Sequence, residues 1–237
     1  MANEKETWSL FYEGFVEFLK MNEGEKAKKI LKILNKIYPT TPTPLKHKNI
    51  FTLLVSVLLS AQCTDLNVNN VTKNIYPHYY KPEHFVKLGR KKIENLIKKI
   101  GIFRVKAKSI YLMSKQLLNN HNGKVPKTFE ELEKLPGVGH KTASVVMSQG
   151  FGYPAFAVDT HIHRLAQRWG LTNGKNVIQT EKDLKRIFPK NTWSKLHLQI
   201  IYYGREYCKA RDCYGISCKI CTTCYPKRKK PILTKKP

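Results

Sequence analysis

The stretch from Leu135 to Arg164 reads LPGVGHKTASVVMSQGFGYPAFAVDTHIHR. Its first half predicts a hairpin turn and the helix that follows it. The segment before it, TFEELEK, has capping-box spacing between Thr128 and Glu131, which predicts the start of a short helix. A proline and two glycines, Gly137 and Gly139, then end that helix in a tight turn. We expect the second helix to begin directly after the turn.

This hairpin is suited to bind phosphate. If the second helix begins at about His140, the N–H groups of residues 138–141 have no acceptor within the helix and lie at the positive end of its dipole. Such a terminus binds an anion without any side-chain charge. The residues expected to contact a nucleic-acid phosphate are Gly137, Val138 and Gly139. A helix-turn-helix that only packs inside the protein has the same local pattern, so both interpretations stay open here.

Two residues of the same stretch are candidates for catalysis. Lys141 falls in the first turn of the second helix, where the dipole disfavours a cation and favours the free amine, which is a nucleophile. Asp159 comes directly before the next helical segment, whose N-terminus would hold its carboxylate ionised. We expect Lys141 and Asp159 to be the catalytic pair. The alternatives are a solvated surface lysine and an aspartate that only caps its helix.

Further motifs follow in order along the chain. Leu58 to Asp65 reads LLSAQCTD, Ile100 to Phe103 reads IGIF, and a Tyr-Gly-Arg sequence at 203–205 precedes a cysteine-rich segment. With the hairpin, these motifs resemble the endonuclease III branch of the helix-hairpin-helix DNA glycosylases, from about residue 25 to residue 224. The resemblance implies duplex DNA with damaged bases or abasic sites as the partner of a monomeric protein.

The resemblance also implies an activity. It is that of a bifunctional DNA glycosylase and abasic-site lyase, which excises oxidised pyrimidines from duplex DNA in base excision repair. Lys141 would attack C1′ of a nucleotide flipped out of the duplex and displace its base, and the resulting imine would lead to strand scission. Asp159 would stabilise positive charge on the sugar. Two alternatives stay open: a thymine glycosylase for G:T mismatches on the same fold, and a non-catalytic helix-hairpin-helix protein that only binds DNA.

Four more residues receive roles from the resemblance. Gln62 and Ile102 would fill the gap left by the flipped nucleotide, because an uncharged amide and a branched apolar group can stack against the orphan base. His161 would lie near the pocket or the DNA backbone, and Glu133 near the damaged base. Structural alternatives stay open: Gln62 as a polar residue at a helix end, Ile102 as a core residue, and His161 as a histidine whose ring only makes structural hydrogen bonds. The role of Glu133 is equally open.

Composition agrees with a nucleic-acid partner. The chain of 237 residues has 43 basic against 17 acidic residues, a formal charge of +26, and this excess attracts a polyanion. No apolar segment follows the polar N-terminus as in a secretory signal. The longest apolar run, Phe51 to Ala61, is too short to span a bilayer and predicts a buried helix. We therefore expect a cytoplasmic protein, bound to the nucleoid through DNA and without a membrane partner.

Apolar spacing is helical almost throughout and no alternating strand pattern is present, so we expect an all-α fold. The resemblance adds two lobes. One is a six-helix bundle with the hairpin, formed by residues 43–155. The other is a cysteine-cluster lobe, formed by residues 25–42 and 156–226. Outside them we expect an N-terminal helical extension at 1–24 and a disordered basic tail at 227–237.

Five of the six cysteines lie between residues 208 and 224, which favours a metal site over disulfides in a reducing compartment. The resemblance implies a [4Fe–4S] cluster on four cysteines spaced C-x6-C-x2-C-x5-C. This chain departs from that spacing. Its best match leaves Cys213 spare and selects Cys208, Cys218, Cys221 and Cys224. Four thiolates suit tetrahedral zinc equally well, and a degenerate site without metal is a third alternative.

Overall fold

The computed structural model describes residues 21–236, and every regular element in this part of the chain is helical. The all-α expectation is therefore confirmed. The extension predicted at 1–24 lies outside the described residues up to residue 20. Within the described range, none of the helices combines the length and the apolar character that crossing a bilayer requires.

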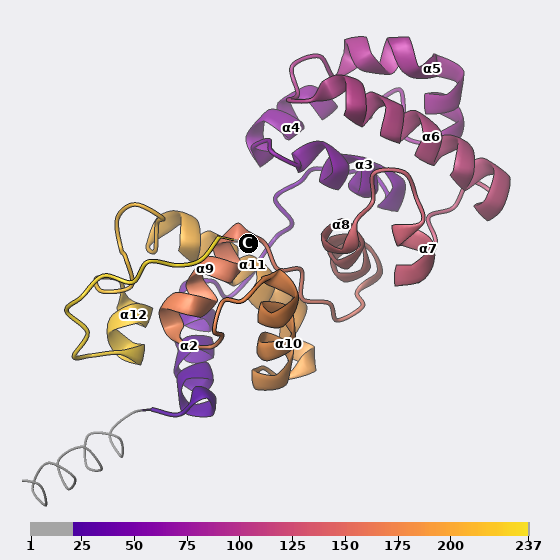
Figure 1. Ribbon diagram of the computed structural model, residues 1–237. Coiled ribbons are helices and arrows are strands. Elements are labelled where there is room, and N and C mark those ends of the chain that lie inside the picture. Colours follow the sequence, from indigo (N-terminus) through magenta and orange to yellow (C-terminus); the bar gives the residue numbers. More distant parts are fainter. Residues whose placement is uncertain (1–20, 237) are drawn as a thin grey trace, which may run out of the picture.

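The first lobe contains six α-helices (Figure 1): α3 (Ile50–Ser60), α4 (Asp65–Thr72), α5 (Pro82–Leu96), α6 (Phe103–His121), α7 (Phe129–Glu133) and α8 (His140–Val145). The last of these continues into a π-helical turn, η1 (Val146–Gly150). Helix α3 is apolar on all sides and almost fully buried, so it forms the centre of this lobe. A reciprocal pair of hydrogen bonds between Asn49 and Thr52 fixes where it begins.

The second lobe combines the beginning and the end of the described chain (Figure 1). It contains α2 (Glu23–Ile37), α9 (Thr160–Trp169), α10 (Val177–Ile187), the 3-10 turn η2 (Lys190–Thr192), α11 (Trp193–Glu206) and α12 (Lys219–Cys224). Its core is separate from that of the first lobe and is built around the buried aromatic rings of Phe156, Trp169 and Tyr203. The first core runs from Leu45 to Ala155, so the chain passes between the lobes twice, before Leu45 and after Ala155.

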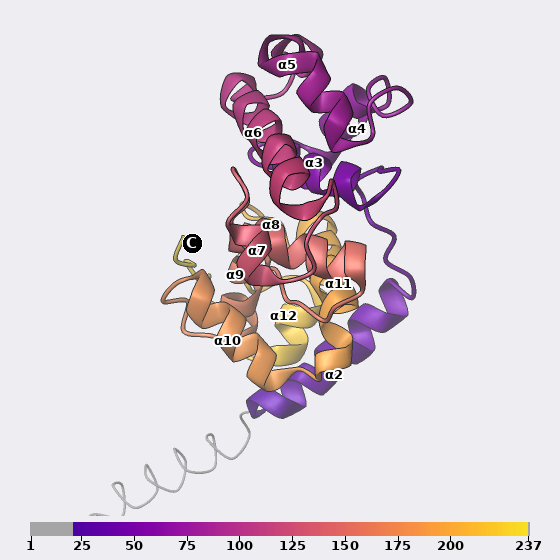
Figure 2. The same cartoon turned by 90° about the vertical axis from the view of Figure 1, so that its right-hand side faces the viewer.

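Polar contacts join the two lobes. Arg205 on α11 forms an ion pair with Asp65 on α4, with 2.8 Å between Nη1 and Oδ2. On another side, Nε2 of His140 at the start of α8 lies 3.2 Å from Oε2 of Glu181 on α10. Figures 1 and 2 both place α7 and α8 on the side of the first lobe that faces the second. The hairpin is therefore part of the boundary between the lobes.

The basic tail is ordered over its described part, so the expectation of disorder was wrong. The Arg228 guanidinium donates to the carbonyl oxygens of Arg168 and Gly215, and it stacks 3.6 Å above the Tyr225 ring. Farther along, the Ile232 N–H donates to the Tyr214 carbonyl. Backbone acceptors and an aromatic face therefore hold the tail, despite its charge.

Candidate active site

The hairpin has the backbone that its glycines predict. Gly137 adopts φ +81°, and a Cβ built there would lie 2.7 Å from Cβ of Ser109 on α6. Between the glycines, Val138 is buried in the core of the first lobe and anchors the turn. The first helical bond of α8 runs from the Ala143 N–H to the Gly139 carbonyl. The N–H groups of residues 140–142 thus precede the helical ladder, as a phosphate site requires. The expectation was wrong for Val138, whose N–H donates to the Leu135 carbonyl over 3.0 Å and is not free.

Asp159 forms the N-cap of α9, as predicted. Its Oδ1 accepts a hydrogen bond of 2.9 Å from the Ile162 N–H, and its Oδ2 lies 3.1 Å from Nδ1 of His161. Burial of the Asp159 side chain by itself raises its pKa. The hydrogen bond and charge of His161, the Ile162 N–H and the charge of Lys141 outweigh burial, so the pKa lies far below its usual value. Asp159 is a fixed anion near neutral pH.

A cavity of about 440 Å³ lies between the lobes and brings several predicted residues together. Lys141 lines it from α8, and Asp159 and His161 line it from the start of α9. Gln62 reaches it from the turn after α3. Its volume falls in the range of small-molecule pockets. An exposed lysine and a carboxylate of fixed charge, whose side chain is only 10% exposed, thus face one space from the two lobes.

The other predicted DNA-contact and pocket residues do not line this cavity. Gly137, Val138 and Gly139 lie in the adjoining hairpin, and Ile102 is half exposed on the surface of the first lobe. Instead of pointing into the cavity, the Glu133 carboxylate contacts Nδ1 of His140 at 2.7 Å. The DNA-binding roles of these residues and the base-contact role of Glu133 stay predictions.

Gln62 and Ile102 share an unusual backbone. Their φ angles are +53° and +56°, in the left-handed region that non-glycine residues rarely adopt. The two turns also approach each other closely, because a Cβ built on Gly101 would lie 3.7 Å from the Gln62 carbonyl oxygen. Strain of this kind persists only where the surrounding structure enforces it, and it is common at ligand sites.

A buried lysine, Lys106 on α6, enforces this arrangement. Its Nζ donates to the carbonyl oxygens of Leu59 and Ala61, at 2.9 and 2.6 Å, and so closes the C-terminal end of α3 directly before Gln62. Its backbone N–H donates to the Ile102 carbonyl. The Lys106 side chain therefore fixes the turn before Gln62, and the first helical bond of α6 fixes the turn at Ile102. Sequence reasoning missed Lys106, because a lysine by itself indicates a solvated surface position.

His197 on α11 is a second cavity residue that sequence reasoning missed. Its Nδ1 donates to the Ala157 carbonyl oxygen over 2.7 Å, and burial lowers its pKa to about 4. It is therefore neutral near pH 7 and presents an uncharged ring to the cavity next to Asp159. Nothing in the sequence around it marks its helix face as facing a cavity.

His140, given no role from sequence, links the hairpin to α10. Burial lowers the pKa of its ring, but the Glu133 hydrogen bond and the charge of Glu181 raise it more, so the net shift is upward. The ring also stacks on Phe129, with 5.6 Å between centroids. His140 directly precedes Lys141, so this link helps to fix the start of α8 against the second lobe.

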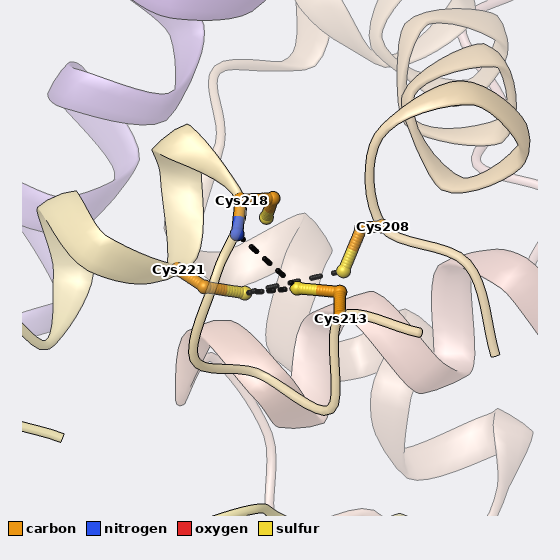
Figure 3. A group of neighbouring side chains, drawn as sticks. All are labelled: Cys208, Cys213, Cys218 and Cys221. Atoms are coloured by element: carbon orange, nitrogen blue, oxygen red, sulfur yellow. Dashed lines mark hydrogen bonds between the residues drawn. The ribbon is translucent and has the colours of Figure 1, made fainter. Parts of the chain in front are cut away.

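Four cysteines of the second lobe point their sulfurs toward one another (Figure 3). They are Cys208, Cys213, Cys218 and Cys221, all buried, and their Sγ atoms all lie within 4.8 Å of one another. The structure therefore groups Cys213 with three of the predicted ligands and places Cys224 outside the group. Four convergent thiols suit a metal centre.

Comparison with known proteins places these observations in a family. The sequence model of the HhH-GPD superfamily base excision DNA repair proteins matches residues 55–190. The chain is 43% identical over 189 residues to endonuclease III of Bacillus subtilis (strain 168), covering 79% of this chain and 86% of that protein. It is 41% identical over 210 residues to endonuclease III of Escherichia coli (strain K12), covering 87% of this chain and 99% of that protein.

Solved structures agree. A trapped covalent intermediate of endonuclease III with DNA, described as an estranged-adenine complex, matches with a TM-score of 0.80 and 41% identity, covering 84% of this chain and 94% of that one. A thermostable thymine-DNA glycosylase matches with a TM-score of 0.69 at 21% identity, covering 82% of this chain and 91% of that one, and shares the fold. The chain belongs to the HhH-GPD superfamily of base excision DNA repair proteins.

Proposed function

We propose that the protein is a bifunctional DNA glycosylase and abasic-site lyase that excises oxidised pyrimidines from duplex DNA, acting at the nucleoid. The observation that carries this proposal is the placement of Lys141 and Asp159 on two lobes around one cavity. The names of the relatives support the substrate class, and the trapped covalent complex of a relative supports a nucleophile that bonds to DNA.

In the first step, Lys141 gives up a proton, and the freed amine bonds to C1′ of the flipped nucleotide while the bond between C1′ and the base breaks. The base leaves with the bonding electrons and takes up a proton. Positive charge develops on the sugar, and the Asp159 carboxylate is suited to stabilise it because its own pKa is held low. The neighbouring neutral His197 adds no competing positive charge to the cavity.

In the second step, the sugar opens to an imine with Lys141. The imine makes the C2′ proton acidic, and loss of that proton breaks the bond between C3′ and its oxygen. The 3′ phosphate leaves with the electron pair, and water releases Lys141 from the product. A glycosylase that used water as its nucleophile would stop at the abasic site, so Lys141 is the residue that predicts strand scission.

Opening the duplex requires groups that replace the flipped nucleotide. Gln62 and Ile102 are both exposed and lie on adjoining turns, and the Lys106 side chain fixes the backbone directly before Gln62. Exposed side chains on backbone that is already fixed are suited to insert between bases, because the turns that carry them need little further ordering on binding. The surplus of basic residues attracts the phosphates on either side.

A metal centre in the cysteine group has a structural role, since it would fix the segment from Cys208 to Cys221 and takes no part in the steps above. The resemblance implies a [4Fe–4S] cluster. The donor set of four thiolates suits it, but the short distances between the sulfurs do not.

The experiment compares excision and strand scission on duplexes that contain thymine glycol, a G:T mismatch or only normal pairs. Wild type should excise thymine glycol and cut the strand, and Lys141→Ala should do neither. Lys36→Ala, which removes an exposed lysine at the end of α2, is the matched control and should behave as wild type. If wild type prefers the G:T duplex, the substrate class is mismatched thymine and not oxidised pyrimidines. If wild type binds the duplexes without excising a base, only the DNA-binding function is left.

A further inference from the structure

The sulfurs of the cysteine group are spaced for a single ion. Cys208 and Cys213 each place Sγ 3.9 Å from Sγ of Cys221, and no pair among the four exceeds 4.8 Å. Around one tetrahedral zinc ion with Zn–S bonds of about 2.3 Å, neighbouring sulfurs lie about 3.8 Å apart. In a [4Fe–4S] cluster each thiolate binds a different iron, which puts the sulfurs on the order of 6 Å apart. The observed distances match the first arrangement.

The surrounding structure holds these positions. The Cys218 N–H donates to Sγ of Cys213, and an Arg168 N–H donates to Sγ of Cys208 over 3.3 Å. Arg168 also donates to the carbonyl oxygens of Lys209 and Ala210, which fixes the turn after Cys208. Donors aimed at sulfur stabilise thiolates, as a metal site requires.

Arg168 gives independent support for a charged centre. It is 2% exposed, and within residues 21–236 no carboxylate forms an ion pair with it. A buried guanidinium needs a counter-charge. Zinc with four thiolates carries a net charge of about −2. The Arg168 guanidinium, which donates to Sγ of Cys208, offsets part of this charge. Four neutral thiols would leave Arg168 without this partner.

The fifth cysteine lies elsewhere. Cys224 is buried at the end of α12, where that helix packs on α2, and its sulfur is not among the four that lie within 4.8 Å of one another. Cys213, by contrast, sits between Cys208 and Cys218 in the loop before α12 (Figure 3). The geometry therefore separates one cysteine from the other four.

We propose that Cys208, Cys213, Cys218 and Cys221 bind one zinc ion in a closed, redox-inert structural site, in place of the family's cluster. All four coordination positions are filled by protein, so the ion has no open position for substrate and serves to hold the second lobe together. This inference does not depend on the glycosylase activity.

Metal analysis of the full-length protein, expressed with both zinc and iron supplied and purified without oxygen, tests the metal. We expect one zinc per chain, no inorganic sulfide and no visible absorption. Replacement by Co²⁺ should give the intense visible spectrum of tetrahedral cobalt with four thiolates. Iron with stoichiometric sulfide would overturn the proposal, and so would a folded protein that holds no metal.

Paired variants test the ligands. Cys213→Ser should weaken zinc binding more than tenfold in competition with a chromophoric chelator, whereas Cys224→Ser should bind as wild type. Cys213→His should retain zinc, because imidazole replaces a thiolate in zinc sites, and it keeps the test valid if the serine variant fails to fold. Loss of metal in Cys224→Ser, with retention in Cys213→Ser, would contradict the ligand set.

Discussion

Alanine at Gly137 and alanine at Gly139 should have opposite consequences, although the two positions belong to one hairpin. At Gly137, φ is +81°, and the added Cβ would lie 2.7 Å from Cβ and 2.8 Å from Oγ of Ser109. At Gly139, φ is −99° and a Cβ would meet no atom within 4 Å. The first substitution therefore strains the fold, and the second does not.

The cost at Gly137 has two parts. A left-handed backbone costs alanine about 1–2 kcal/mol relative to glycine. Displacing Ser109 on α6 adds about 1–2 kcal/mol of overpacking. Gly137→Ala should therefore lower the free energy of unfolding by about 2–4 kcal/mol, which corresponds to a Tm roughly 4–16 °C lower in a chain of this size.

Gly139→Ala should keep its Tm but lose affinity for DNA. A methyl group in the open space before α8 blocks the approach of a phosphate to the N–H groups of residues 140–142. Loss of one hydrogen bond to a charged group costs about 1.5 kcal/mol, or roughly tenfold in Kd.

Thermal unfolding followed by circular dichroism measures the first quantity, and fluorescence anisotropy with a duplex carrying a stable abasic analogue measures the second. A Gly137→Ala protein with wild-type Tm would refute the packing argument. A Gly139→Ala protein with wild-type affinity would refute phosphate binding by the hairpin.

Three further substitutions test other contacts. Asp159→Asn should slow single-turnover excision by about 100-fold or more while the amide still caps α9, so a wild-type rate would remove the carboxylate from the mechanism. Lys106→Met should lower the free energy of unfolding by about 2–4 kcal/mol in urea, because one buried and one partly buried carbonyl lose a charged donor, and an unchanged midpoint would contradict its capping role. The raised pKa of His140 means that its contacts stabilise the fold fully below about pH 6.5 and lose this effect as pH rises through the folded-state pKa. The difference in Tm between wild type and His140→Gln should therefore shrink from pH 6 to pH 9 and in high salt, and a pH-independent difference would argue against this link.

The parts of the site that sequence predicted are those with local causes. The turn glycines, the start of α8 and the Asp159 cap each depend on a few neighbouring residues, and the structure reproduces them. Lys106 had no such signal, because its acceptors at 59 and 61 are far away in the sequence.

Cysteine spacing was also insufficient to choose among five thiols. Cys213 lies in the loop between Cys208 and Cys218, and Cys224 follows Cys221 by three residues, so the spacing allows either as the fourth ligand. Only the folded positions of the sulfurs decide between them. The prediction of a disordered tail was wrong for a related reason. Its charge suggested disorder, but its arginine found backbone acceptors in the second lobe.

Borohydride trapping followed by peptide mapping tests the central claim most directly. Wild-type protein should form a covalent adduct with a thymine glycol duplex, and the modified peptide should carry the sugar on Lys141. Lys141→Ala should bind the same duplex and form no adduct. An adduct on another lysine, or tight binding by wild type without any adduct, would contradict the assignment of Lys141 as the nucleophile.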